Sequence, residues 1–171
     1  AETLLGQGDL KKASQALAPL LQYKFGESSD AQIKALNEKL KTATALLVSA
    51  LADLGAHVSY HVPVRETASH GIDLLHLRQV ITAGARLILT CDTGVTAHEA
   101  VAYARGQGVD VIVTDHHELG ASLPDATAII NPKLLPSREH PLADLPGVGV
   151  AYKLAEALYE RARRPKDASR H

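Results

Sequence analysis

The stretch Val111-Ile112-Val113-Thr114-Asp115-His116-His117 decides how this chain is interpreted. Three apolar β-branched residues indicate a buried strand, and a carboxylate and two imidazoles follow where that strand meets solvent. Carboxylate oxygens and imidazole nitrogens bind divalent metals that activate water or hold phosphate oxygens. Two adjacent histidines also occur in solvated turns, so the choice between these interpretations depends on the surrounding sequence.

Strand and helix patterns alternate around this stretch from Gly55 onwards. The alternation predicts an α/β fold with a mainly parallel sheet between two layers of helices. Upstream, apolar residues recur at helical spacing from Ile33 to Leu54, so we predict that a helical segment precedes the sheet. The predicted strands are 57–62, 86–90, 110–114 and 126–130, and the predicted helices after Gly55 are 72–83, 96–105 and 148–163.

Composition narrows the class of protein. The 171 residues carry a formal net charge of −1, so no overall basic field indicates nucleic acid, and any such contact must be local. A lone Cys91 excludes an intramolecular disulfide and a cysteine-rich zinc site, and it agrees with a reducing compartment. No apolar run has the length of a membrane-spanning helix and no signal peptide is apparent, so we expect a cytoplasmic protein without a membrane partner.

A second acid follows the strand predicted at 86–90, in Cys91-Asp92-Thr93-Gly94. One crossover helix joins this strand to the one that ends at Asp115. If the two strands are neighbours, Asp92 and Asp115 lie about 5 Å apart at the carboxyl edge of the sheet. Ligands bind at that edge in open parallel sheets. The alternative is that each aspartate only caps a following helix.

These residues belong to segments that resemble a known family. The segment LILTCDTGVTAHEAVAYARGQGVDVIVTDHHELGASLPDATAIINPK, from Leu87 to Lys133, is similar to the second and third motifs of the DHH phosphoesterases. The segment DLPGVGVAYKLAEAL, from Asp144 to Leu158, resembles the region after the DHH motif in RecJ-type single-strand-specific exonucleases. The segment from Thr42 to Arg65 resembles the helix and strand that follow the family's first motif.

The resemblance implies a function and a set of roles. It implies hydrolysis of phosphodiester bonds in single-stranded DNA from the 5′ end, in DNA repair or recombination, with Mn²⁺ or Mg²⁺ as cofactor and single-stranded nucleic acid as partner. By the same resemblance Asp92 and His116 are metal ligands, His117 faces the scissile phosphate, and Asp115 supports the site. The division implied is a helical segment at 1–41, a partial DHH domain at 42–164 and a loose tail at 165–171.

The sequence also departs from the family's pattern. Where the first motif has its aspartates, this chain has Ala35, Asn37 and Lys39, and a fourth-motif aspartate is not found within the 171 residues. Glu38 or Glu118 could substitute as ligands, although nothing in the spacing requires it. Three interpretations therefore stand: an impaired exonuclease, a catalytically silent binding domain, or a DHH phosphodiesterase that acts on short oligonucleotides or cyclic dinucleotides.

Three further features allow two interpretations each. Arg65 is a candidate for binding substrate phosphate, or else a solvated loop charge. Lys133, after the strand predicted at 126–130, is a second phosphate candidate or simply part of a strand exit. Gly147-Val148-Gly149 could offer backbone N–H groups to a phosphate, although close packing at the start of a helix is the simpler interpretation.

Overall fold

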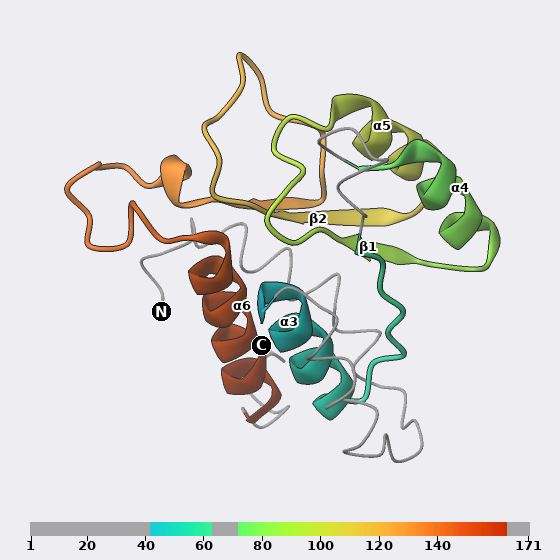
Figure 1. Cartoon of the computed structure of the whole chain (residues 1–171), viewed down its shortest axis with the longest axis horizontal. Coiled ribbons are helices and arrows are strands. Elements are labelled where there is room, and N and C mark those ends of the chain that lie inside the picture. Colours follow the sequence, from blue (N-terminus) through green and yellow to red (C-terminus); the bar gives the residue numbers. More distant parts are fainter. Residues whose placement is uncertain (1–41, 63–71, 164–171) are drawn as a thin grey trace, which may run out of the picture.

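Three parallel strands form the sheet in the computed structural model of the chain, which describes residues 42–62 and 72–163 (Figure 1). They are β1 (Leu87–Leu89), β2 (Asp110–Thr114) and β3 (Ala128–Ile130), in the order β1-β2-β3. β2 is the central strand, with Ile112 opposite Leu89 on one side and Ala128 on the other. The predicted parallel pairing of the strands that precede Asp92 and Asp115 is therefore confirmed.

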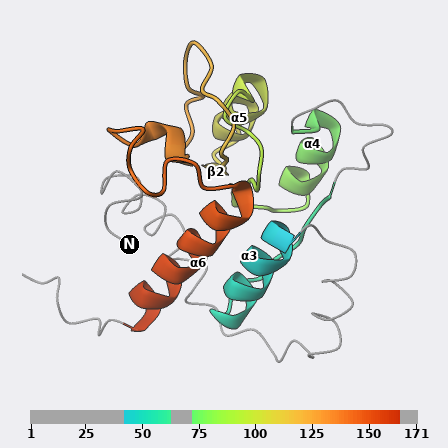
Figure 2. The ribbon, with the colours of Figure 1, turned by 60° about the vertical axis from the view of Figure 1, so that its left-hand side comes forward.

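Helices cover both faces of the sheet, as predicted. Figure 1 shows α4 (Leu74–Thr82) and α5 (His98–Gly106) above the sheet, with α3 (Thr42–Asp53) and α6 (Gly147–Arg163) below it. In the turned view of Figure 2, α3 and α6 again lie side by side. The structure is thus a three-layer α/β fold.

Strand periodicity explains why β2 packs against both helix layers. Successive side chains of a strand point to opposite faces, so alternate residues of β2 enter two different cores. Ile112 packs with buried residues of α3 and α6, whereas Val111 and Val113 pack with those of α4 and α5. The buried residues that complete the first core include Leu47, Leu51, Ile130, Leu154 and Leu158.

The connections place two loops at the carboxyl edge of the sheet. α5 connects β1 to β2, as predicted. Residues 115–127 connect β2 to β3 with neither helix nor strand, and a short 3₁₀ helix (η2, Pro132–Leu134) follows β3. Residues 90–97 and 115–127 therefore both leave the sheet at the same edge, and they contain Asp92, Asp115, His116 and His117.

The predicted bounds mostly agree with the observed ones, with one error. Residues 57–62 form no strand, so that prediction is wrong. The ring of His61 stacks on that of His76 instead, with centroids 3.7 Å apart. α4 begins at Leu74, two residues later than predicted, because the side chain of Asp73 caps it.

Several predictions concern parts of the chain outside the described residues. They are the helical segment at 1–41 with its first-motif positions, the loop residue Arg65 and the tail at 165–171. Across residues 42–62 and 72–163, none of the helices combines the length and apolar character that a bilayer crossing requires.

Candidate metal centre

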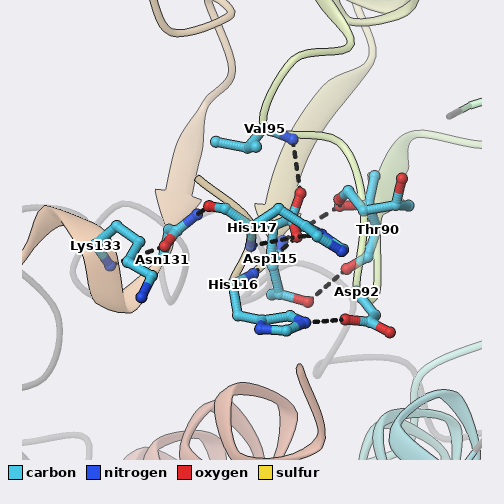
Figure 3. A network of polar contacts seen from close by, with 10 residues as sticks. Thr90, Asp92, Val95, Asp115, His116, His117, Asn131 and Lys133 are labelled. Atoms are coloured by element: carbon cyan, nitrogen blue, oxygen red, sulfur yellow. Dashed lines mark hydrogen bonds and ion pairs between the residues drawn. The ribbon is translucent and has the colours of Figure 1, made fainter. Parts of the chain in front are cut away.

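Three possible ligands meet at the carboxyl edge of β1 and β2: Asp92, His116 and His117. One ligand atom from each lies within 4.8 Å of the other two. Asp92 comes from the loop after β1, and both histidines come from the loop after β2 (Figure 3). The structure thus brings together three residues that the sequence placed at neighbouring strand ends.

The backbone holds Asp92 in an uncommon conformation. Its φ of +61° is in the left-handed region, which costs free energy for a residue with a Cβ atom. Its N–H donates to the carbonyl of Thr114 at 2.9 Å, which continues the pairing of β1 with β2 beyond the strand. Strain of this kind concentrates at functional sites, where the surrounding structure fixes the residue.

One carboxylate oxygen of Asp92 has no hydrogen-bond partner among the described residues. Oδ1 is buried and accepts none from any residue that the structure describes. His116 Nε2 lies 3.0 Å from it, within ion-pair distance but without hydrogen-bond geometry. A buried carboxylate oxygen is costly unless it is paired or coordinates a metal. This oxygen, together with two imidazoles beside it, fits a divalent cation.

Asp115 differs from Asp92, because both of its carboxylate oxygens accept hydrogen bonds from backbone N–H groups. Its side chain is buried; Oδ2 accepts from Val95 N–H at 2.9 Å, and Oδ1 accepts from the N–H groups of His116 and His117 at 2.7 and 3.2 Å. The ring atom His117 Nδ1 also lies 2.6 Å from Oδ1. Asp115 therefore orders the histidine loop and lies outside the three-residue cluster (Figure 3).

These contacts govern the protonation of Asp115. Burial raises the pKa of its carboxyl group, but the hydrogen bonds from Val95, His117 and His116 lower it by more. The net pKa is below the usual value for an aspartate, so Asp115 is charged at neutral pH. A charged Asp115 favours a proton on His117 Nδ1, which leaves Nε2 available at the exposed end of the ring.

The helix-cap interpretation of the two aspartates is wrong. The N-cap of α5 is Ala97, without a side-chain cap, and the described loop after Asp115 contains no helix before β3. Neither aspartate therefore caps a helix, and both lie in the loops that directly follow β1 and β2.

Asn131 is a site-supporting residue that the sequence interpretation missed. It follows β3 and is 2% exposed. Its Nδ2 donates to the carbonyl of His117 at 3.0 Å, and its Oδ1 accepts from Lys133 N–H at 2.8 Å. A polar residue at the end of a buried strand was the available signal, because such a side chain must find partners inside the fold.

Two threonines tie the loops of Asp92 and the histidines together, and they were also missed. Thr114 Oγ1 donates to the carbonyl of Thr90 at 2.6 Å, and Thr114 N–H donates to Thr90 Oγ1 at 3.2 Å. Thr90 Oγ1 in turn donates to the carbonyl of Thr93 at 2.7 Å. These bonds fix the two strand ends relative to each other, and thereby the separation of the candidate ligands.

The charges at the rim pair with one another. Lys133 Nζ lies 3.3 Å from Asp144 and 3.6 Å from Glu118, and Arg138 lies 3.3 Å from Glu118. The hydrogen bond from Arg138, more than any other contact, holds the pKa of Glu118 below its usual value. Lys133 is thus balanced by two carboxylates, and Glu118 is engaged with cations rather than with the three-residue cluster.

Comparison with protein families matches residues 41–170 to the DHH family, N-terminal domain. The chain is 47% identical over 118 residues to the single-stranded-DNA-specific exonuclease RecJ of Salmonella typhimurium. It is 42% identical over 117 residues to that of Bacillus subtilis. Both alignments cover 68% of this chain, but only 20% and 15% of the respective relatives, so the chain spans a fifth of their length or less.

Two solved structures share the fold. A crystal structure of exonuclease RecJ bound to manganese matches with a TM-score of 0.72 at 32% identity, covering 93% of this chain and 39% of that one. The structure of RecJ in complex with Mn²⁺ from Thermus thermophilus matches with a TM-score of 0.68 at 30% identity, covering 96% of this chain and 22% of that one.

Proposed function

This chain belongs to the DHH family, and we propose on that basis that it takes part in metal-dependent hydrolysis of single-stranded DNA. The reaction would cleave phosphodiester bonds from the 5′ end, in DNA repair or recombination in the cytoplasm. The observation that carries the proposal is the cluster of Asp92, His116 and His117, which converge within 4.8 Å at the carboxyl edge of the parallel sheet. The RecJ relatives, which are single-stranded-DNA-specific exonucleases, support the choice of substrate.

Mn²⁺ or Mg²⁺ is the proposed cofactor. A carboxylate suits either ion, and imidazole favours Mn²⁺, the ion named for both solved RecJ structures. When bound, such an ion supplies positive charge that polarises the phosphate and makes water a better nucleophile.

Each residue of the centre has a proposed role. Asp92 and His116 hold the ion through Oδ1 and Nε2, which already lie 3.0 Å apart. His117 presents Nε2 to a phosphate oxygen of the substrate, since Asp115 holds its Nδ1 and its side chain is 62% exposed. Asp115 stays charged and keeps that ring oriented. Arg65 is proposed to bind a second phosphate of the strand.

The number of ligands sets the expected level of activity. Of the three groups that cluster within the described residues, two are assigned to the ion and one to the substrate, whereas a two-metal centre needs more carboxylates. We therefore expect this chain to bind one ion and to turn over slowly. A silent binding domain and a phosphodiesterase for short oligonucleotides or cyclic dinucleotides are the alternatives that the experiments separate.

Calorimetric titration with Mn²⁺ tests the metal site. We expect a dissociation constant tighter than about 10 μM, equivalent to about −7 kcal/mol. Asp92→Asn and His116→Ala should weaken it by about 10-fold or more, because each removes a ligand. His98→Ala, an exposed histidine outside the cluster, is the matched control and should bind as the wild type does. Absence of Mn²⁺ binding by the wild type would exclude the proposal.

Nuclease assays then separate the functions. Single-stranded DNA carrying a 5′ phosphate should be shortened in the presence of Mn²⁺, and His117→Ala should abolish this while it retains most of the metal affinity. Binding of Mn²⁺ without cleavage of any substrate would identify a silent domain. Preferential cleavage of dinucleotides would identify the other type of phosphodiesterase.

A further inference from the structure

The first residue of α6 lies against the carboxylate of Asp92. A Cβ atom placed on Gly147 would overlap Asp92 Oδ1 and would lie 2.7 Å from its Cγ and 3.0 Å from its Cβ. Cβ atoms do not tolerate such separations, so any side chain at this position requires Asp92 or α6 to move. This contact supports the interpretation of the Gly147-Val148-Gly149 segment as close packing at the start of a helix.

α6 is poorly able to move away. Four residues of its next three turns, Val150, Ala151, Leu154 and Leu158, are buried in the core that contains Ile112 and Ile130. The N–H groups of Gly149 and Val150 donate to the carbonyl of Pro146 at 2.8 and 3.1 Å, which fixes the first turn. Displacement of the helix would disturb all of this packing at once, because protein cores are close-packed.

The backbone of Asp92 is also fixed, so a Cβ atom on Gly147 would displace the Asp92 side chain. Its N–H is bonded to Thr114, and its φ is already +61°. Rotation of the carboxylate remains as the least costly response to a new methyl group. That rotation would move Oδ1 away from His116 Nε2, which lies 3.0 Å from it in the native arrangement.

We propose that Gly147 is a positioning residue for the metal centre. The absence of a side chain at this position lets the start of α6 confine the carboxylate of Asp92, with Oδ1 directed towards His116. The consequence for metal affinity rests on the proposed function, whereas the contact between Gly147 and Asp92 does not.

Calorimetric titration of the full chain with Mn²⁺ measures the first consequence. Gly147→Ala should weaken the affinity by about 10- to 100-fold, the range typical for residues that orient a metal ligand. Gly106→Ala, where a Cβ meets nothing within 4 Å, should leave the affinity unchanged. Gly149→Ala is the control within α6, because its Cβ would meet the end of the flexible Leu145 side chain instead of a ligand.

Thermal unfolding of the metal-free protein tests the contact without any metal. Asp92→Gly removes the three atoms that lie nearest to the new Cβ, and the positive φ of position 92 suits glycine. Gly147→Ala should therefore lower the melting temperature less in the Asp92→Gly background than in the wild type. If Gly147→Ala alone fails to fold, the double variant should still fold.

Equal shifts in melting temperature in the two backgrounds, or a double variant that also fails to fold, would overturn the inference. So would unchanged Mn²⁺ affinity in Gly147→Ala when the wild type binds the ion. Absence of Mn²⁺ binding by the wild type contradicts the proposed function instead, and the comparison of melting temperatures then decides the role of Gly147 alone.

Discussion

Two aspartates at neighbouring strand ends differ in what their oxygens contact. Asp115 accepts hydrogen bonds from Val95, His116 and His117, whereas Oδ1 of Asp92 is buried and accepts none from the described residues. A carboxylate whose oxygens are all hydrogen-bonded stabilises the fold, while one with an uncompensated oxygen is available to a cation. The difference lies in the surroundings, because the residue type and the position after a strand are the same.

Replacement of Asp115 by asparagine should destabilise the protein. An amide has one acceptor oxygen, and its NH₂ group would face N–H donors that are buried with it. We expect a loss of about 1–3 kcal/mol in the free energy of unfolding, the cost of leaving buried polar groups unsatisfied. Urea unfolding of the metal-free protein measures it. Asp125→Asn, at an exposed position, is the control, and equal midpoints for the two variants would contradict the role assigned to Asp115.

Sequence patterns could find the candidate ligands but not the residues that position them. Asp92 and the two histidines directly follow apolar strand patterns, so their position at the sheet edge follows from chain order. Asn131, Thr90 and Gly147 act across 14, 24 and 55 positions of the sequence respectively, on His117, Thr114 and Asp92. Contacts over such separations depend on the folded arrangement and leave no local periodicity.

Among the elements, β2 was predicted with the correct bounds and the strand at 57–62 was wrong. β2 is central and buried, so its apolar run reflects contacts on both faces. Residues 57–62 also alternate between apolar and polar, but a strand exists only where its backbone groups pair with a neighbour. Within the described residues that segment has no such pairing, and alternation alone cannot reveal this.

α3 and α6 are linked by a hydrogen bond whose contribution depends on pH. Tyr159 on α6 donates to Asp53 Oδ2 at the end of α3 at 2.8 Å. Burial, and next the hydrogen bond to Asp53, raise the pKa of Tyr159 above its usual value of 10.0. Because the raised pKa belongs to the folded state, the hydrogen bond contributes fully to stability below pH 10. This contribution is lost as the pH rises through the pKa of Tyr159 in the folded state.

The stability of Tyr159→Phe should therefore fall less at alkaline pH than that of the wild type. Both proteins lose stability as other groups titrate, so the difference between their melting temperatures isolates Tyr159. We expect the advantage of the wild type at pH 7 to diminish above pH 10. Melting temperatures recorded by circular dichroism across this range provide the measurement, and a constant difference between the two proteins would contradict the dependence on Tyr159 ionisation.

Across the whole molecule, two separate cores support one site. The core shared by α3, α6 and one face of β2 includes Val150 and Ala151, which closely follow Gly147 on α6, and Gly147 in turn lies against Asp92. The other core, with α4 and α5, supports the strands from the opposite face. The alternation of strands and helices predicted both layers, because each helix carries an apolar stripe that must be buried.

Shortening a side chain in the core shared by α3, α6 and β2 should lower the free energy of unfolding much more than shortening one at the surface. Leu154 is 1% exposed, and its replacement by alanine should lower the free energy of unfolding by about 2–5 kcal/mol. Leu75→Ala, on α4 where the leucine is 68% exposed, is the matched control and should change it by about 0.5 kcal/mol or less. Denaturant midpoints compare the two, and similar losses would contradict the burial assigned to Leu154.

The left-handed backbone of Asp92 also means that the residue best for stability at this position differs from the residue best for the proposed function. Glycine, asparagine and aspartate are the residues that adopt such a conformation most readily, and glycine does so at no steric cost. Selection for folding alone would therefore favour glycine at position 92. Of the residues that adopt this conformation readily, only aspartate carries a charge, so under the proposed function the native residue sacrifices some stability of the fold for the capacity to hold a metal.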